Sequence, residues 1–104
     1  MAPLPTLTPE QREHALAAAK EARRLRSEAL AKLRTGQLTI TAAFTDNTSP
    51  LWEAKVRQVL LAVPGVGKVK ADTLLADLGI KETRRVKGLG SNQRTKLVAA
   101  LTAA

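Results

Sequence analysis

The sequence predicts an all-α protein in which a long N-terminal helix precedes a compact domain of short helices. Apolar residues recur at helical spacing through the first third of the chain. Proline and glycine divide the rest into short apolar segments, as they do between helices. The β-branched run at 39–41 is compatible with a strand, but no partner strand is apparent, so we expect a helix there.

Composition limits the classes of protein to which the chain can belong. Its 104 residues, 44% of them hydrophobic, are enough for one domain with a modest core. The absence of cysteine excludes a disulfide framework and thiolate chemistry. No apolar run is long enough to span a membrane and no signal peptide is recognisable at the N-terminus, so we expect a cytoplasmic protein.

The net charge of +8 and the isoelectric point near 10.7 favour a polyanionic partner such as nucleic acid. The charge is unevenly distributed along the chain. Residues 50–104 carry ten basic and four acidic side chains, whereas residues 1–36 carry seven basic and four acidic ones. The C-terminal part is therefore the stronger candidate for binding.

The N-terminal part is expected to contain a disordered leader, residues 1–8, and one long helix, residues 9–35. Thr8 is suited to cap this helix, with Pro9 at its first position and Gln11 completing a capping box. The apolar stripe of the helix is narrow and mostly alanine, so only part of its length should lie on the domain. Its basic side chains either are solvated or contact DNA, and the sequence leaves both open. The stripe consists of Ala15, Ala18, Ala22, Leu25, Ala29 and Leu33.

Residues 36–104 are expected to form the compact domain, which begins with a short helix over 38–46. Ser49 should cap a further helix over 50–62, with Trp52 at the edge of the core. The side chains expected to be buried from these two helices are Ile40, Ala43, Phe44, Leu51, Val56, Val59 and Leu60.

Two more helices are expected after a turn at 63–67. The first covers 68–78 and ends at Gly79, which can adopt the left-handed backbone conformation. A short helical turn at 81–84 follows, and Ser91 should cap the last helix. The side chains expected to pack inward are Val69, Leu74, Leu75, Leu78, Leu97, Val98 and Leu101.

The turn Pro64-Gly65-Val66-Gly67 is the first motif that suggests a function. Proline ends the preceding helix, and the two glycines leave no side chain between the backbone and an approaching ligand. The amides of Val66, Gly67 and Lys68 would then lie free at a helix start, where anions bind. Lys68 and Lys70 add positive charge, so the turn is predicted to bind a nucleic-acid phosphate.

The second motif combines three cations, Arg84, Arg85 and Lys87, with the glycine turn Gly88-Leu89-Gly90. Arginine presents a planar set of donors that matches a phosphate, and a free amide at Gly90 would bind one too. Arg85, between the two glycine turns, is expected to enter the minor groove, where the potential is most negative.

Together the two motifs resemble a helix–two-turn–helix DNA-binding unit, similar to that of a small-subunit ribosomal protein. The runs 63–67 and 84–90 most resemble the actinobacterial type of integration host factor, over residues 49–104 and, less specifically, the long helix. The resemblance implies a nucleoid-associated protein that binds duplex DNA broadly, and we expect it to be a monomer. It also implies effects on DNA compaction, topology, transcription or site-specific recombination. The predicted DNA-binding residues are Pro64, Gly65, Val66, Gly67, Lys68, Lys70, Arg84, Arg85, Lys87, Gly88, Gly90 and Arg94.

Enzymatic readings do not fit the motifs. Helix–hairpin–helix glycosylases carry a catalytic lysine where this chain has Val69, and a phosphate-binding Walker loop needs Ser or Thr there. Gln93 stands where a dinucleotide-binding fingerprint has its third glycine. The single histidine, His14, has no ligand partners at metal spacing, so we expect no metal, cofactor or catalysis.

Two other readings remain as alternatives to DNA binding. One is an RNA-binding, ribosome-associated protein, although Phe44 and Trp52 are better suited to the core than to stacking on bases. The other is a protein–protein adaptor in which the long helix docks a partner, for example a recombinase.

Overall fold

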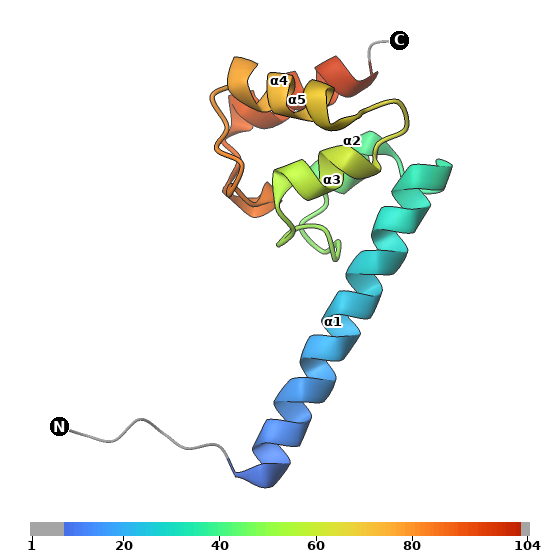
Figure 1. The fold of residues 1–104 in the computed structure, drawn as a ribbon, viewed down its shortest axis with the longest axis vertical. Helices are drawn as coiled ribbons and strands as arrows, with labels where there is room; N and C mark the ends of the chain where they lie inside the picture. Colours follow the sequence, from blue (N-terminus) through green and yellow to red (C-terminus); the bar gives the residue numbers. More distant parts are fainter. Residues whose placement is uncertain (1–7, 103–104) are drawn as a thin grey trace, which may run out of the picture.

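The computed structural model describes residues 8–102, and helix α1 (Pro9–Thr35) projects from a group of shorter helices (Figure 1). The bounds of the others are α2 (Ile40–Thr45), α3 (Val56–Ala62), α4 (Lys68–Asp77), the 3₁₀ helix η1 (Val86–Gly88) and α5 (Ser91–Thr102). No strand occurs in residues 8–102 beyond one isolated bridge between Lys55 and Arg85, so the all-α prediction is confirmed. All of the predicted leader except Thr8 lies outside the described residues.

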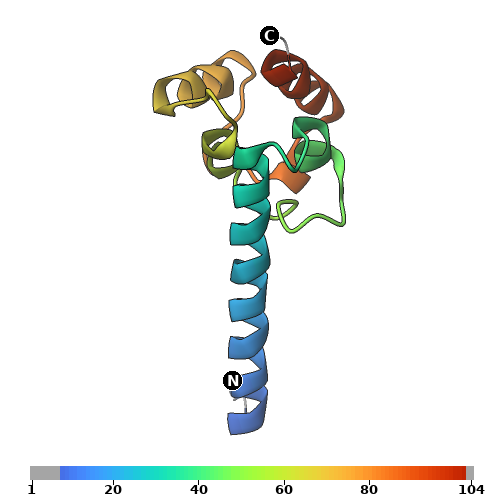
Figure 2. The same cartoon turned by 90° about the vertical axis from the view of Figure 1, so that its right-hand side faces the viewer.

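Helix α1 begins and ends at the predicted signals. The Thr8 side chain accepts a hydrogen bond from the amide of Gln11, and the Gln11 side chain accepts one from the amide of Thr8. Gly36 ends the helix at φ +84°. Only Ala29 and Leu33 of α1 are buried, whereas Leu16 is 56% exposed. The N-terminal part of α1 therefore stands clear of the domain, as Figure 2 shows from the side.

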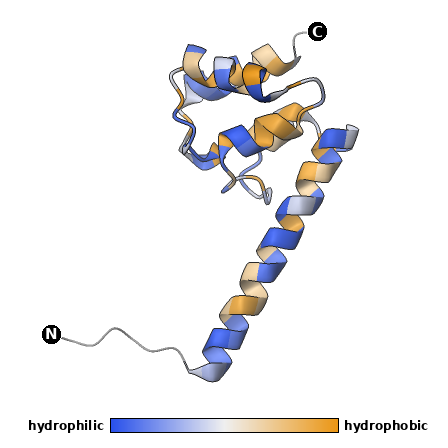
Figure 3. Cartoon of the chain, in the orientation of Figure 1, coloured by the Kyte–Doolittle hydropathy of each residue, from blue (hydrophilic) through white to orange (hydrophobic). Residues whose placement is uncertain are grey.

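The core of the domain lies where α1 meets α3, α3 meets α4 and α2 meets α5. The largest fully buried side chains include Phe44, Leu51, Leu60 and Leu97. Trp52 is half-buried at the core edge, as predicted. Figure 3 shows apolar residues concentrated on α3, whereas along α1 they alternate with hydrophilic ones.

The helix predicted over 50–62 is wrong in its first part, because α3 begins only at Val56. The preceding residues form turns, in which the carbonyls of Trp52 and Ala54 accept the amides of Lys87 and Val86 at 2.8 and 2.9 Å. If a helix continued through residues 50–62, these carbonyls would instead accept the amides four residues further along the chain. A distant segment thus replaces the expected helical turn.

Three further predictions are corrected. Val69 is 81% exposed, because the core face of α4 follows Ala71 and Leu75 at helical spacing and Val69 lies on the other side. At 81–84 the chain makes a single turn, in which the amide of Arg84 donates to the carbonyl of Lys81 at 2.9 Å, but no helix, and the 3₁₀ helix η1 follows. The short helix expected over 38–46 exists but is confined to α2, with Thr39 as its cap.

Candidate nucleic-acid interface

The turn between α3 and α4 is held by its own backbone and by one buried side chain. Gly65 has φ +83°, a left-handed conformation that glycine adopts without strain. The amide of Val66 donates to the carbonyl of Val63 at 3.1 Å, and the Val66 side chain is only 8% exposed. The prediction of a free amide at Val66 is therefore wrong, and Val66 anchors the turn instead.

The start of α4 is open. Gly67 precedes the helix in an extended conformation, and no side chain caps the helix start. A Cβ placed on Gly67 would meet nothing within 4 Å. The first amides of an α-helix have no acceptor within the helix, so those of Gly67 and Lys68 remain suited to bind an anion. The side chains of Lys68 and Lys70 beside them are exposed.

The second motif is fixed to the start of α3 by backbone hydrogen bonds. The amide of Val56 donates to the carbonyl of Arg84 at 2.9 Å, next to the bridge between Lys55 and Arg85. Val86, inside this segment, is completely buried. The cationic segment 84–88 therefore has a defined backbone, although its basic side chains are exposed.

Each of the three cations has a partner within the protein. Arg84 donates to the carbonyl of Gly88 at 3.0 Å, and a Cβ on Gly88 would lie 3.0 Å from the Arg84 side chain. Arg85 donates to the backbone carbonyl of Glu53 at 2.5 Å. The ammonium of Lys87 lies 3.3 Å from the Glu53 carboxylate. Because these contacts are exposed to solvent, the cations can exchange them for phosphate oxygens at low cost.

Arg94 is built into the fold more firmly than the other cations. Its guanidinium donates to the carbonyls of Val86 and Leu89 at 3.0 and 3.1 Å. It also lies over the ring of Trp52, 4.6 Å from the ring centre. Arg94 thus connects α5, η1 and the turn at residue 52. A direct DNA contact by Arg94 stays a prediction.

The amide of Gly90 is also occupied, which corrects the prediction that it is free. It donates to the side chain of Gln93 at 3.1 Å, and α5 begins at Ser91, so Ser91 does not cap that helix. A glycine followed three residues later by glutamine at a helix start is a capping pattern that the sequence already contained. Glu53 and Trp52, in contrast, are partners that no local pattern could have assigned to this site.

The two motifs lie at opposite ends of α3, as Figure 1 shows for the loop after α3 and the segment before α5. Seven residues of helix separate them by about 10 Å. Arg57 on α3 forms an ion pair with Asp72 on α4 at 2.9 Å, which raises the pKa of Arg57 above its ordinary value. This partly exposed pair joins α3 to α4 next to the buried contacts between the two helices.

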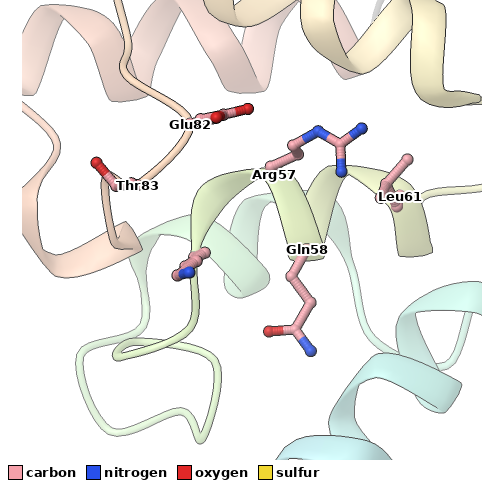
Figure 4. A pocket seen from close by; sticks show the side chains of 6 residues that line it. Arg57, Gln58, Leu61, Glu82 and Thr83 are labelled. Atoms are coloured by element: carbon pink, nitrogen blue, oxygen red, sulfur yellow. The ribbon is translucent and has the colours of Figure 1, made fainter.

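A shallow recess of about 360 Å³ lies along α3, between the two motifs. Figure 4 shows that Arg57 and Gln58 reach it from α3, while Glu82 and Thr83 line it from the segment after α4. Its mixed charges and open shape differ from the enclosed, mostly apolar pockets that bind small molecules.

The described part of the chain holds no group of three or more residues suited to bind a metal. His14 is exposed on α1. None of the helices in residues 8–102 is long and apolar enough to cross a membrane.

The comparisons with known proteins agree on one family. The model of the S13-like H2TH domain matches residues 33–101. The chain is 44% identical over 97 residues to the integration host factor of Mycobacterium tuberculosis, covering 91% of this chain and 92% of that protein. It is 43% identical over 96 residues to the integration host factor of Streptomyces coelicolor, covering 90% of each.

A solved structure of sIHF bound to an 8-bp palindromic DNA superposes with a TM-score of 0.76 and 36% identity. The match covers 82% of this chain and 98% of that one. With an S13-like H2TH domain, near-complete coverage of these relatives and the same fold, the chain belongs to the actinobacterial integration host factor family.

Proposed function

We propose that this protein binds duplex DNA through backbone phosphates and the minor groove, with little sequence specificity. The observation that carries the proposal is that two motifs with donors suited to phosphate lie at the two ends of α3. One motif is the open start of α4 with Gly67 and Lys68, and the other is the cationic segment 84–88. The DNA bound by the structural relative sIHF supports the choice of ligand.

Phosphate contacts account for the low sequence specificity of this mode of binding. The start of α4 offers amides and lysines, and the cationic segment offers Arg85 and Lys87, all of which are donors to phosphate oxygens. Both motifs are made of turns and short segments, and neither is a helix laid out to read base edges in the major groove. Preference among DNA sites would then come from groove width and bendability.

In the cell, the protein would act as a monomer on the nucleoid in the cytoplasm. Binding of this kind would affect DNA compaction and topology and, through them, transcription and recombination. The exposed part of α1 is the surface we propose for a protein partner such as a recombinase. The protein would act by binding, without catalysis.

A fluorescence-anisotropy titration tests the proposal directly. The probes are one duplex DNA, an RNA duplex of equal length and a single strand, each over a series of salt concentrations. We expect tightest binding to duplex DNA, with an affinity that falls steeply with salt because counterions are released. Tighter binding to RNA would instead favour a ribosome-associated role, and binding to none of the probes would favour the adaptor role.

A further inference from the structure

Glu53 contacts two of the three exposed cations of the cationic segment, Arg85 and Lys87. Its backbone carbonyl accepts a hydrogen bond from Arg85 at 2.5 Å, and its carboxylate lies 3.3 Å from the ammonium of Lys87. The two cations come from a segment more than thirty residues away in the sequence. A single acidic residue therefore meets two of the side chains proposed to bind phosphate.

The fold holds the backbone of Glu53 beside these cations. The residues on either side of it, Trp52 and Ala54, use their carbonyls to accept the amides of Lys87 and Val86. Glu53 is thus attached at both flanks to the segment that it contacts. Its carboxylate therefore remains within reach of Lys87 even when the ion pair opens.

The ion pair itself is weak enough to break. The side chain of Glu53 is 67% exposed and that of Lys87 is 49% exposed, so water screens their attraction. A DNA phosphate that approaches Lys87 competes with the carboxylate for the ammonium, and the nearby carboxylate repels the phosphate. Both effects oppose DNA binding, and both act at Lys87.

We propose that Glu53 is an affinity-determining residue that weakens DNA binding by competing with phosphate for Lys87. The proposal rests on the proposed DNA-binding function. It predicts that a neutral side chain of the same shape at position 53 makes the protein a tighter DNA binder. The contact between Arg85 and the Glu53 backbone would be kept in such a variant.

The test compares Glu53→Gln with Glu13→Gln in duplex-DNA anisotropy titrations over a salt series, using the full chain. Both variants remove one negative charge, but Glu13 lies on the projecting part of α1, about 24 Å along the helix from buried Ala29. We expect Glu53→Gln to bind about 3- to 5-fold tighter than wild type at low salt, with a smaller gain at high salt. Glu13→Gln should change the affinity less than about 2-fold, because its charge is distant and screened.

A double-mutant cycle with Lys87→Gln shows whether the effect passes through Lys87. In the Lys87→Gln background, the gain from Glu53→Gln should largely disappear, because no ammonium remains to be released. An undiminished gain in that background, or equal effects of Glu53→Gln and Glu13→Gln, would overturn the inference while leaving the proposed function intact. If the wild-type protein does not bind the duplex at all, both fail.

Discussion

At the residue scale, Gly65 and Gly67 are required for different reasons. Gly65 has φ +83°, so any side chain there strains the backbone, although nothing lies within 4 Å of the added Cβ. Gly67 has φ −93°, which every residue adopts, and it also has open space around it. The first glycine therefore supports the fold, and the second keeps the start of α4 accessible.

This difference predicts opposite results for two alanine variants. Gly65→Ala should lower the free energy of unfolding by about 1 to 2 kcal/mol, the cost of a left-handed alanine. Gly67→Ala should leave the free energy of unfolding nearly unchanged but weaken DNA binding, since its methyl group lies where a phosphate approaches the amides. Urea unfolding and anisotropy separate the two effects. A stable Gly67→Ala protein with full affinity would exclude phosphate binding at this turn.

Arg85 is the residue from which we expect the largest single contribution to DNA binding. Arg85→Ala should weaken binding far more than Arg12→Ala, a matched loss of one arginine on the projecting part of α1. The reason is that Arg85 belongs to the fixed segment between the two turns, where a groove contact is possible. Anisotropy with the same duplex measures both variants. Equal small losses would contradict groove entry by Arg85.

Asp46 gives the fold a dependence on acidic pH. The hydroxyl and the amide of Thr48 both donate hydrogen bonds to the Asp46 carboxylate. These bonds, the hydroxyl's being the larger cause, lower the pKa of Asp46 below its ordinary 3.8. The carboxylate thus stabilises the fold at pH values above 3.8, and this stabilisation is lost as pH falls through the lower folded pKa. Urea unfolding should show wild type more stable than Asp46→Asn at neutral pH and no different well below pH 3.8. A constant difference across that range would contradict this assignment.

At the scale of elements, α5 holds the cationic segment in place through Arg94. Its guanidinium binds two carbonyls of the chain around η1 and stacks on the half-buried Trp52 ring. A lysine has the same charge but cannot make the two-carbonyl contact and the planar stack together.

Arg94→Lys should therefore reduce stability by about 1 to 2 kcal/mol while the net charge stays the same. We expect DNA affinity to fall by about 5-fold with an unchanged salt slope, because the segment is less ordered but its phosphate contacts remain. The emission of Trp52, the single tryptophan, should also shift. If Arg94 mainly contacts phosphate, lysine should instead preserve most of the affinity.

At the scale of the whole molecule, α1 gives the protein a principal extent of 52 Å against 34 and 23 Å for the other two. The domain uses only the C-terminal part of α1 for its core. On the part of α1 that precedes its buried residues, Arg24 forms surface ion pairs with Glu21 and Glu28. Hydrogen bonding and charge attraction within these pairs raise the pKa of Arg24 and lower the pKa of Glu21. These exposed pairs support the projecting helix, although pairs of this kind contribute little each.

A truncated protein that begins at Glu21 should keep the domain intact. The removed residues 1–20 carry two basic and two acidic side chains, so the net charge does not change. We expect the unfolding midpoint to fall by less than about 4 °C, because no buried side chain among the described residues is lost. DNA affinity and salt slope should match those of the full chain in anisotropy. A large loss of affinity would show that the projecting part of α1 contacts DNA.

Local signals in the sequence determined most of the elements of this protein. Helix-capping and helix-ending signals act within a few residues of the chain, so both ends of α1 and the C-terminal ends of α3 and α4 were predictable. These signals are the capping box of Thr8 and Gln11, the left-handed Gly36 and Gly79, and the proline after α3. The two glycine motifs were predictable for the same reason. Their pairing in one unit rested on resemblance to a family, which the comparisons confirm.

Only the tertiary structure decided what those motifs contact. Residues 50–54 do not form the expected helical turn, because the carbonyls of Trp52 and Ala54 accept the amides of residues 87 and 86. This pairing places Glu53 and Trp52 against the cationic segment. The tertiary structure also places the Arg94 guanidinium against the carbonyls of Val86 and Leu89 and over the ring of Trp52. Hydrogen bonds across more than thirty residues depend on how the helices pack, and no periodicity or spacing within one segment encodes them.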